Sequence, residues 1–343
     1  MRVCVDGRLI DKFQNTGISR YTEFLIEYYI NAYGDKNITI VTNDINFKKN
    51  NCVIVFTKLK PYNIFHFLRF SDFIRSLKID LLHVPFYSAL SNKNENIKVI
   101  VTVHDLMYRL VDGFFGKNKI IRLFKLYYFD FIVKKSLDNS DLIISVSQST
   151  KNDVLAEFGF NSIHIPEDSN IQSFFDFSIL QKLNLSKKGY FFYCGNNRPH
   201  KNIDFVRELF KNNLDLPPLV LAGNGHQSAS NIIAIGIVSE EELYALYKYA
   251  IAFIFPSKYE GFGLPVLESL RLETFVIASK IPAFLEFKSK NIFYFELNNK
   301  DEFLMAIDKS KTQSFIKEES FLDYYDKSRI YKLNDQMLKD YIE

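Results

Sequence analysis

Cysteines and long apolar runs are both scarce in this sequence, and each scarcity excludes a class of protein. The chain contains only three cysteines, Cys4, Cys52 and Cys194, an odd number in widely separated strand-like segments. This pattern favours buried thiols over a disulfide framework, a metal site or a redox function. No apolar run approaches the roughly 20 residues of a bilayer-spanning helix, and the N-terminus lacks the apolar core of a signal peptide. We therefore expect a cytoplasmic protein.

The composition is that of a folded protein large enough for two hydrophobic cores. Hydrophobic residues make up 47% and charged residues 24% of the chain, which excludes an intrinsically disordered protein. A chain of 343 residues also exceeds the length at which a single core usually stops growing. Two globular domains are therefore expected.

Short β-branched segments alternate with helical ones through both halves of the chain. This alternation is typical of parallel sheets covered by helices on both faces. The expected strands are 3–5, 38–41, 52–56, 81–84, 99–103, 142–146, 190–194, 219–222, 232–235, 251–255, 275–278 and 292–295. The sequence therefore predicts an α/β protein with two doubly wound domains, a linker in the strand-poor stretch 166–178 and an active site in the cleft between the domains.

The most informative segment is 260–268, which reads Glu-Gly-Phe-Gly-Leu-Pro-Val-Leu-Glu. It follows an expected strand, and its proline suits the first turn of a helix. Helix N-terminal amides attract anions, and Gly261 and Gly263 would let a diphosphate approach the backbone. Glu260 and Glu268 are then best explained as acceptors for sugar and ribose hydroxyl groups. The simpler alternative is a helix N-terminus with favourable acidic neighbours.

This segment resembles the E-x7-E motif of retaining glycosyltransferases of family 4, which have the GT-B fold of two Rossmann-like domains facing a cleft. The agreement extends upstream through 235–244 and 250–257. The resemblance implies a hexosyltransferase that uses a nucleoside diphosphate sugar and needs no other cofactor. The residues of the motif favour a donor similar to GDP-mannose. It further implies a glycan acceptor, lipid-linked or at the cell surface, as in O-antigen or lipopolysaccharide biosynthesis.

The resemblance also implies the division of the chain and the positions of the donor site. Residues 1–172 would form the acceptor-side domain, 173–325 the nucleotide-sugar domain, and 326–343 a helix that crosses back to the first domain. The implied donor-binding residues are Gly17, Arg198, Lys201, Gly236, Val238, Glu260, Gly261, Phe262, Gly263, Leu264 and Glu268.

Three of the matched residues are expected to take part in catalysis: Lys201, Glu260 and His104. Lys201 matches the family lysine that neutralises the donor diphosphate, and a fixed cation stabilises a leaving diphosphate as its charge develops. Its simpler explanation is a solvated loop lysine. His104 matches a family histidine that faces the transferred sugar, although a histidine at a strand end is more often structural. In either case Asp105 could orient the imidazole ring.

Two negative observations narrow the chemistry. No Asp-x-Asp triplet occurs, so the metal-binding signature of GT-A transferases is missing and catalysis is expected to be metal-independent. The run 223–228 superficially resembles a dinucleotide fingerprint, but it lacks the last glycine and a suitably placed acidic residue. Nicotinamide binding is therefore not expected.

Positive charge is unevenly distributed over the first half of the chain. Residues 117–136 carry six cations against Asp130, interleaved with apolar side chains, and 58–78 have a similar character. Such segments suggest peripheral docking on an anionic membrane, here the inner face of the cytoplasmic membrane. The simpler alternative is a pair of core helices with solvated basic faces. Nucleic-acid binding is not expected, because no recognition motif accompanies the charges.

Two other functions remain open at this level. A sugar-nucleotide epimerase can share the two-domain architecture, and incubation with the donor alone would distinguish it from a transferase. A noncatalytic sugar-nucleotide sensor is disfavoured because Lys201, Glu260 and Glu268 are all present.

Overall fold

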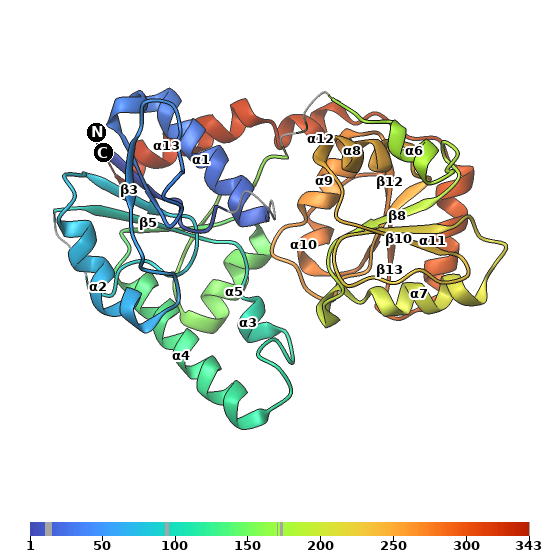
Figure 1. The fold of residues 1–343 in the computed structure, drawn as a ribbon, viewed down its shortest axis with the longest axis horizontal. Coiled ribbons are helices and arrows are strands. Elements are labelled where there is room, and N and C mark those ends of the chain that lie inside the picture. The colour runs from blue at the N-terminus through green and yellow to red at the C-terminus, as the bar shows by residue number, and fades with distance from the viewer. Residues whose placement is uncertain (11–15, 93–95, 170, 172–173, 343) are drawn as a thin grey trace. The chain divides into compact units, whose positions relative to one another are not determined.

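The computed structural model describes residues 1–10, 16–92, 96–169, 171 and 174–342 (Figure 1). The chain divides into two compact units, Met1–Asp168 with Lys327–Glu343, and Ser169–Asp326. Each unit contains one sheet in which every paired strand is parallel to its neighbour. The predicted α/β class, with two doubly wound domains, is confirmed.

The first unit is built on a seven-stranded sheet with the order β3-β2-β1-β4-β5-β6-β7. Its strands are β1 (Val3–Asp6), β2 (Ile38–Thr42), β3 (Val53–Phe56), β4 (Leu81–Val84), β5 (Lys98–Val103), β6 (Leu142–Ser145) and β7 (Ile163–His164). Its helices are α1 (Gly17–Tyr33), η1 (Asp35–Asn37), α2 (Ile64–Arg75), α3 (Met107–Leu110), α4 (Lys119–Asp138), α5 (Gln148–Phe158) and α13 (Lys327–Tyr341). The strand order reverses between β1 and β4, where ligands of such sheets usually bind.

Alternate side chains of these strands enter two cores, one on each face of the sheet. Cys4 of β1 packs in a core with α2, α4 and α5, whereas Val3 and Val5 pack in a core with α1 and α13. Burial on both faces explains why the strands read as continuous apolar runs in the sequence. The C-terminal helix α13 therefore belongs to the first unit, where Lys327 lies 2.9 Å from Glu27 and Tyr28 donates to Asp335.

The second unit is built on a six-stranded sheet with the order β10-β9-β8-β11-β12-β13. Its strands are β8 (Phe191–Cys194), β9 (Leu219–Ala222), β10 (Ile232–Gly236), β11 (Ala252–Phe255), β12 (Phe275–Ser279) and β13 (Ile292–Phe295). Its helices are α6 (Ser178–Lys182), η2 (Pro199–Lys201), α7 (Ile203–Asn212), α8 (Glu240–Tyr249), α9 (Leu264–Arg271), α10 (Pro282–Leu285), α11 (Lys300–Thr312) and α12 (Glu319–Tyr324). Here the order reverses between β8 and β11, so the loops after these strands define the second switch point.

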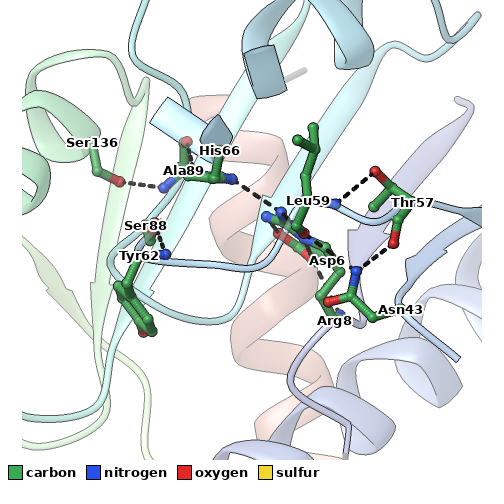
Figure 2. A network of polar contacts seen from close by, with 10 residues as sticks. All are labelled: Asp6, Arg8, Asn43, Thr57, Leu59, Tyr62, His66, Ser88, Ala89 and Ser136. Atoms are coloured by element: carbon green, nitrogen blue, oxygen red, sulfur yellow. Dashed lines mark hydrogen bonds and ion pairs between the residues drawn. The ribbon is translucent and has the colours of Figure 1, made fainter. Parts of the chain in front are cut away.

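A buried ion pair organises the carboxyl end of β1 (Figure 2). The Arg8 guanidinium forms two hydrogen bonds with Asp6, at 2.8 and 2.6 Å, and both side chains are fully buried. It also donates to the Leu59 carbonyl and to Nδ1 of His66 on α2. Because Arg8 is a permanent donor, His66 must accept at Nδ1 and donate from Nε2 to the Ala89 carbonyl at 3.0 Å. The network fixes the start of α2 to the end of β1.

Among the described residues, no helix is both long enough and apolar enough to cross a membrane.

Candidate functional site

The second unit brings Lys201 and Glu260 together at its switch point. Lys201 ends η2 after β8, Glu260 follows β11, and Lys201 Nζ lies 2.6 Å from Glu260 Oε1. Their side chains are 17% and 12% exposed, so the pair is shielded from solvent without being sealed from it. A charge pair in such surroundings is stronger than one on the surface, and it remains reachable by a ligand.

Hydrogen bonds fix the carboxylate of this pair in place. Ser257 Oγ donates to Glu260 Oε1 at 2.6 Å, and the Ser257 carbonyl in turn accepts from Ser279 Oγ. The Lys258 backbone N–H donates to the His200 carbonyl at 2.7 Å and thereby ties the loop after β11 to η2. The lysine and the glutamate are thus held on two loops that are bonded to each other.

The neighbouring histidine contributes no charge near neutral pH. Burial holds the pKa of His200 down to about 4, and repulsion from Lys201 acts in the same direction, against the attraction of Glu260. Of these two neighbouring residues, Lys201 therefore supplies the positive charge that faces Glu260. Its ammonium also lies 5.1 Å from the centre of the Phe255 ring.

The turn before α9 requires glycine at position 263. Gly263 caps α9 with φ +119°, a conformation that L side chains rarely adopt, and a Cβ there would lie 3.0 Å from the Phe284 ring. Phe262 packs edge-on against Phe287 and Tyr325, which anchors the turn to the body of the unit. Gly261 is buried and Leu264 begins the helix, with a proline directly after it.

Glu268 lies in the second turn of α9 and is only 2% exposed. A carboxylate so deeply buried needs polar partners, because an unpaired buried charge is costly. Its position on α9 places it on the helix that directly follows the glycine turn.

The remaining expected donor residues of this unit lie on nearby loops. Gly236 ends β10 with φ +71°, and its carbonyl accepts the Gly223 N–H at 2.7 Å. Val238 is half-buried just before Ser239, which forms a capping box with Glu242 at the start of α8. Arg198 is exposed beside η2, and its backbone N–H donates to Asn196 Oδ1 at 3.2 Å.

Sequence reasoning missed a close approach between the loops after β8 and β9. A Cβ on Gly223 would lie 2.1 Å from the Gly195 carbonyl oxygen, so only glycine fits there. His226 also contacts that carbonyl through Nε2 at 2.8 Å. Gly223, in the run rejected above as a dinucleotide fingerprint, is therefore required by this backbone contact.

In the first unit, His104 lies directly after β5 and is 9% exposed. Its Nδ1 lies 2.6 Å from Glu167 Oε1, and its Nε2 lies 3.1 Å from the Pro85 carbonyl oxygen after β4. Tyr21 of α1 meets the ring edge-to-face, with 4.8 Å between ring centres. The ring is therefore held on three sides near the switch point of the first sheet.

Glu167 is the residue of this unit that the sequence did not reveal. It is buried and lies in the stretch assigned to the linker, where the only available signal was an acidic residue shortly after the last strand of the domain. The carboxylate that meets the imidazole ring is that of Glu167. Asp105, suggested for this role from its position, accepts the first N–H of α3 through Oδ1 at 2.8 Å.

A second histidine supports this arrangement from the core. His83 lies in β4, where Nδ1 is 2.8 Å from the Tyr29 hydroxyl and Nε2 is 2.8 Å from Thr102 Oγ1. Burial lowers the pKa of His83 to about 3, and His104 adds repulsion in the same direction, so His83 is neutral. Gly17, the last expected donor residue, is exposed at the first position of α1, after the Thr16 cap.

The described part of the chain holds no group of three or more histidine, cysteine, aspartate or glutamate side chains arranged to bind a metal ion.

Comparison with known proteins assigns both halves of the chain to the same class. The family described as Glycosyltransferase Family 4 matches residues 20–166, and the family described as Glycosyl transferases group 1 matches residues 176–327. O-antigen chain mannosyltransferase B of Escherichia coli is 26% identical over 324 residues, which cover 80% of this chain and 81% of that protein. O-antigen chain mannosyltransferase RfbU of Salmonella typhimurium is 28% identical over 223 residues, 60% of this chain and 59% of that protein.

Solved structures with the same fold cover almost the whole chain. Sucrose-phosphate synthase of Thermosynechococcus elongatus has a TM-score of 0.75 at 17% identity and covers 98% of both chains. WaaG, a glycosyltransferase involved in lipopolysaccharide biosynthesis, has a TM-score of 0.72 at 11% identity and covers 99% of both. Anabaena HepE in complex with UDP-glucose has a TM-score of 0.73 at 12% identity and covers 98% of this chain and 99% of that one. The chain therefore belongs to the family 4 glycosyltransferases and has the GT-B fold.

Proposed function

We propose that this glycosyltransferase moves a hexose from a nucleoside diphosphate sugar to a glycan hydroxyl with retention of the anomeric configuration. The observation that carries the proposal is the Lys201–Glu260 pair, 2.6 Å apart beside the glycine turn of α9. A cation shielded from solvent, beside a backbone that a ligand can approach closely, can bind a diphosphate. A carboxylate held in a fixed orientation can accept hydrogen bonds from sugar hydroxyls.

In this proposal Lys201 stabilises the leaving group. The bond between the anomeric carbon and the diphosphate oxygen breaks as the acceptor oxygen bonds to the same carbon from the same face. The acceptor proton passes to a phosphate oxygen of the leaving group, so no protein nucleophile is needed. The ammonium of Lys201 is already oriented by Glu260, so it stabilises the developing charge without reorganising.

Glu260 and Glu268 serve the donor in different ways. Glu260 is exposed enough to accept a sugar hydroxyl, and its Ser257 bond holds it in the required orientation. Glu268, on the helix that begins at the turn, is assigned to the ribose hydroxyls of the nucleotide. Arg198 would add positive charge at the diphosphate. Gly261, Phe262, Gly263 and Leu264 would line the path of the diphosphate, and Gly236 and Val238 would contact the nucleotide base.

Mannose is the sugar that we propose, with GDP-mannose as the first donor to test. The curated relatives quoted above are named as O-antigen mannosyltransferases. The same names support a lipid-linked or surface polysaccharide as the acceptor. We expect the reaction to take place in the cytoplasm, at the inner face of the membrane. HepE was solved with UDP-glucose, so UDP-sugars belong in the same panel.

A donor panel followed by product analysis tests the proposal. A donor present at a hundred times its dissociation constant should stabilise the protein by about 2.7 kcal/mol, which thermal-shift measurements detect. With acceptor present, the product should keep the anomeric configuration of the donor, and transfer should persist in EDTA. An altered sugar nucleotide formed from donor alone would indicate an epimerase, binding without turnover a sensor, and activity restored only by a divalent metal a different mechanism.

A further inference from the structure

Helix α4 presents an apolar surface that its own unit leaves uncovered. Residues 116–125 are all exposed, and Figure 1 shows this end of α4 at the tip of the first unit, away from the sheet. Tyr127 is 77% and Ile120 is 70% exposed. The exposed large apolar residues of this helix are Ile120, Ile121, Leu123, Phe124, Tyr127 and Phe131. Exposed apolar side chains in such a group usually mark an interaction site.

These residues form one stripe that continues onto α2. Positions 120, 124, 127 and 131 recur at helical spacing and therefore share one face of α4. At the end of that stripe, Phe131 meets Phe67 of α2 with 5.1 Å between ring centres. Ile64 and Leu68 lie on the same face of α2 as Phe67, and both are exposed. We call Ile64, Leu68, Ile120, Leu123, Phe124, Tyr127 and Phe131 the apolar stripe.

The two helices are fixed to each other where the stripe meets the domain. The Tyr128 hydroxyl donates to the Tyr62 carbonyl at 3.0 Å, and the Tyr62 ring stacks on Phe129 at 5.5 Å. Figure 2 shows Ser136 of α4 accepting the Ala89 N–H at 2.8 Å, within the network that holds the start of α2. The stripe is therefore presented on a rigid base.

The charge at the exposed end of α4 is predominantly positive. Lys117, Lys119, Arg122 and Lys125 flank its exposed end. The one acidic residue of 117–136, Asp130, is partly buried and pairs with Arg109, which also pairs with Glu157. Arg122 meets Asp112 at 3.1 Å, but both side chains are so exposed that the pair is weak. The exposed end of α4 therefore remains cationic.

We infer that the apolar stripe and its flanking cations dock the protein on an anionic lipid bilayer. Apolar and aromatic side chains bordered by lysine and arginine are typical of helices lying in the membrane interface, where tyrosine is also favoured. The centres of protein interfaces are instead depleted in lysine. Nucleic-acid phosphates would engage the cations and leave the stripe in water. This inference concerns a surface apart from the donor residues and does not depend on the proposed function.

Vesicle sedimentation without donor or acceptor tests the inference. The full-length protein should sediment with vesicles containing phosphatidylglycerol and far less with phosphatidylcholine alone. Each cation removed from Lys117, Lys119, Arg122 and Lys125 by substitution with Gln should weaken binding roughly fivefold at low salt. About 1 M salt, which shortens the Debye length to about 3 Å, should also weaken the binding of the unmodified protein to anionic vesicles.

A second set of variants tests the two-helix geometry. Replacing Ile64 and Leu68 of α2 with Ser should weaken vesicle binding, as should replacing Leu123 and Phe124 of α4. The matched controls, Leu214→Ser with Met305→Ser and Lys309→Gln with Lys311→Gln, change comparably exposed side chains of the second unit and should leave binding unchanged. All variants should keep their circular dichroism spectrum and melting temperature.

Three outcomes would overturn the inference. The first is equal binding to neutral and anionic vesicles, or binding to neither. The second is equal loss of binding in the control variants. The third is a concentration-dependent dimer in sedimentation velocity that the α4 substitutions abolish while vesicle binding persists, which would assign the stripe to a second copy of this chain.

Discussion

His104 and Glu167 form a buried pair in which imidazole Nδ1 lies 2.6 Å from carboxylate Oε1. The other ring nitrogen lies 3.1 Å from the Pro85 carbonyl oxygen. Because a carbonyl can only accept, Nε2 carries a proton, and a further proton is shared between Nδ1 and Glu167. The pair thus fixes the orientation of a ring that the family resemblance assigns to the transferred sugar.

The first prediction follows from this pair. Glu167→Ala should reduce the free energy of unfolding by about 1.5–3 kcal/mol, because it removes a hydrogen bond to a charged group. Turnover should also fall, since the ring loses its orientation. The double variant with His104→Ala should show a coupling energy above about 0.5 kcal/mol in urea unfolding. Additive effects of the two substitutions would show that the residues act independently.

The second prediction concerns Lys201. Lys201→Ala should lower turnover by about 10²–10³, the usual cost of removing one group that stabilises transition-state charge. Steady-state kinetics with the donor that the panel identifies measure the loss. Lys258→Ala, on the same pair of loops but exposed, is the matched control and should keep near-normal activity. Comparable losses in both variants would indicate a general effect of loop charge.

The third prediction separates the two glutamates of the motif. Glu268→Gln should weaken nucleotide binding by about 1.5–3 kcal/mol, because a neutral amide replaces an anionic acceptor. Glu260→Ala should instead lower turnover more than nucleoside diphosphate affinity. Calorimetry with the nucleoside diphosphate and kinetics with the sugar donor distinguish these effects. Glu296→Gln, an exposed carboxylate of the same unit, serves as the control. Wild-type transfer by both variants would refute their assignment to the donor.

The strands and their order of succession could be predicted from the sequence. All twelve expected strands are present, each with ends within one residue of the expected position. They were visible because central strands buried on both faces, such as β9 and β11, are apolar along their whole length. The two-residue β7 at the sheet edge gave no such signal. The C-terminal helix expected over 326–343 is α13, which begins at Lys327 and ends at Tyr341.

The contacts within the candidate site could not be predicted from the residues alone. Lys201 and Glu260 are 59 residues apart and meet only because β8 and β11 become neighbours in the sheet. Glu167 lies in a stretch without periodicity, so nothing marked it as the partner of His104. The exposure of α4 was equally hidden, since the same apolar pattern would serve a core helix. In each case the contact or the exposure is determined by the tertiary structure.

The fourth prediction tests the backbone contact between the loops after β8 and β9. Gly223→Ala should be strongly destabilising, because φ is +111° and the new Cβ would lie 2.1 Å from the Gly195 oxygen. Conformational strain of about 1–3 kcal/mol and overpacking of similar size should add together. Gly225→Ala shares the positive φ, +86°, but its Cβ would meet Asn197 at an ordinary 3.4 Å. Equal melting temperatures for the two variants would contradict a specific role for the contact.

The fifth prediction concerns the acid sensitivity of the first unit. Burial holds the pKa of His83 and of His66 down to about 3, with repulsion from His104 and Arg8 respectively as the next cause. In the unfolded chain both should titrate near 6.5. Below that value the unfolded state binds protons that the folded state does not, so stability is full above about pH 6.5 and is lost as the pH falls toward 3. At about pH 5 the protonation of each histidine in the unfolded state should have lowered the free energy of unfolding by about 2 kcal/mol.

Amide hydrogen exchange in β4 and β5 measures this loss within the first unit alone. Protection of these strands should fall between about pH 7 and about pH 5, after correction for the intrinsic pH dependence of exchange. His83→Asn keeps a polar group between Tyr29 and Thr102 but removes the titration. The variant should be less stable at neutral pH and yet lose less on acidification. An unchanged pH dependence would mean that other groups in the core take up the protons.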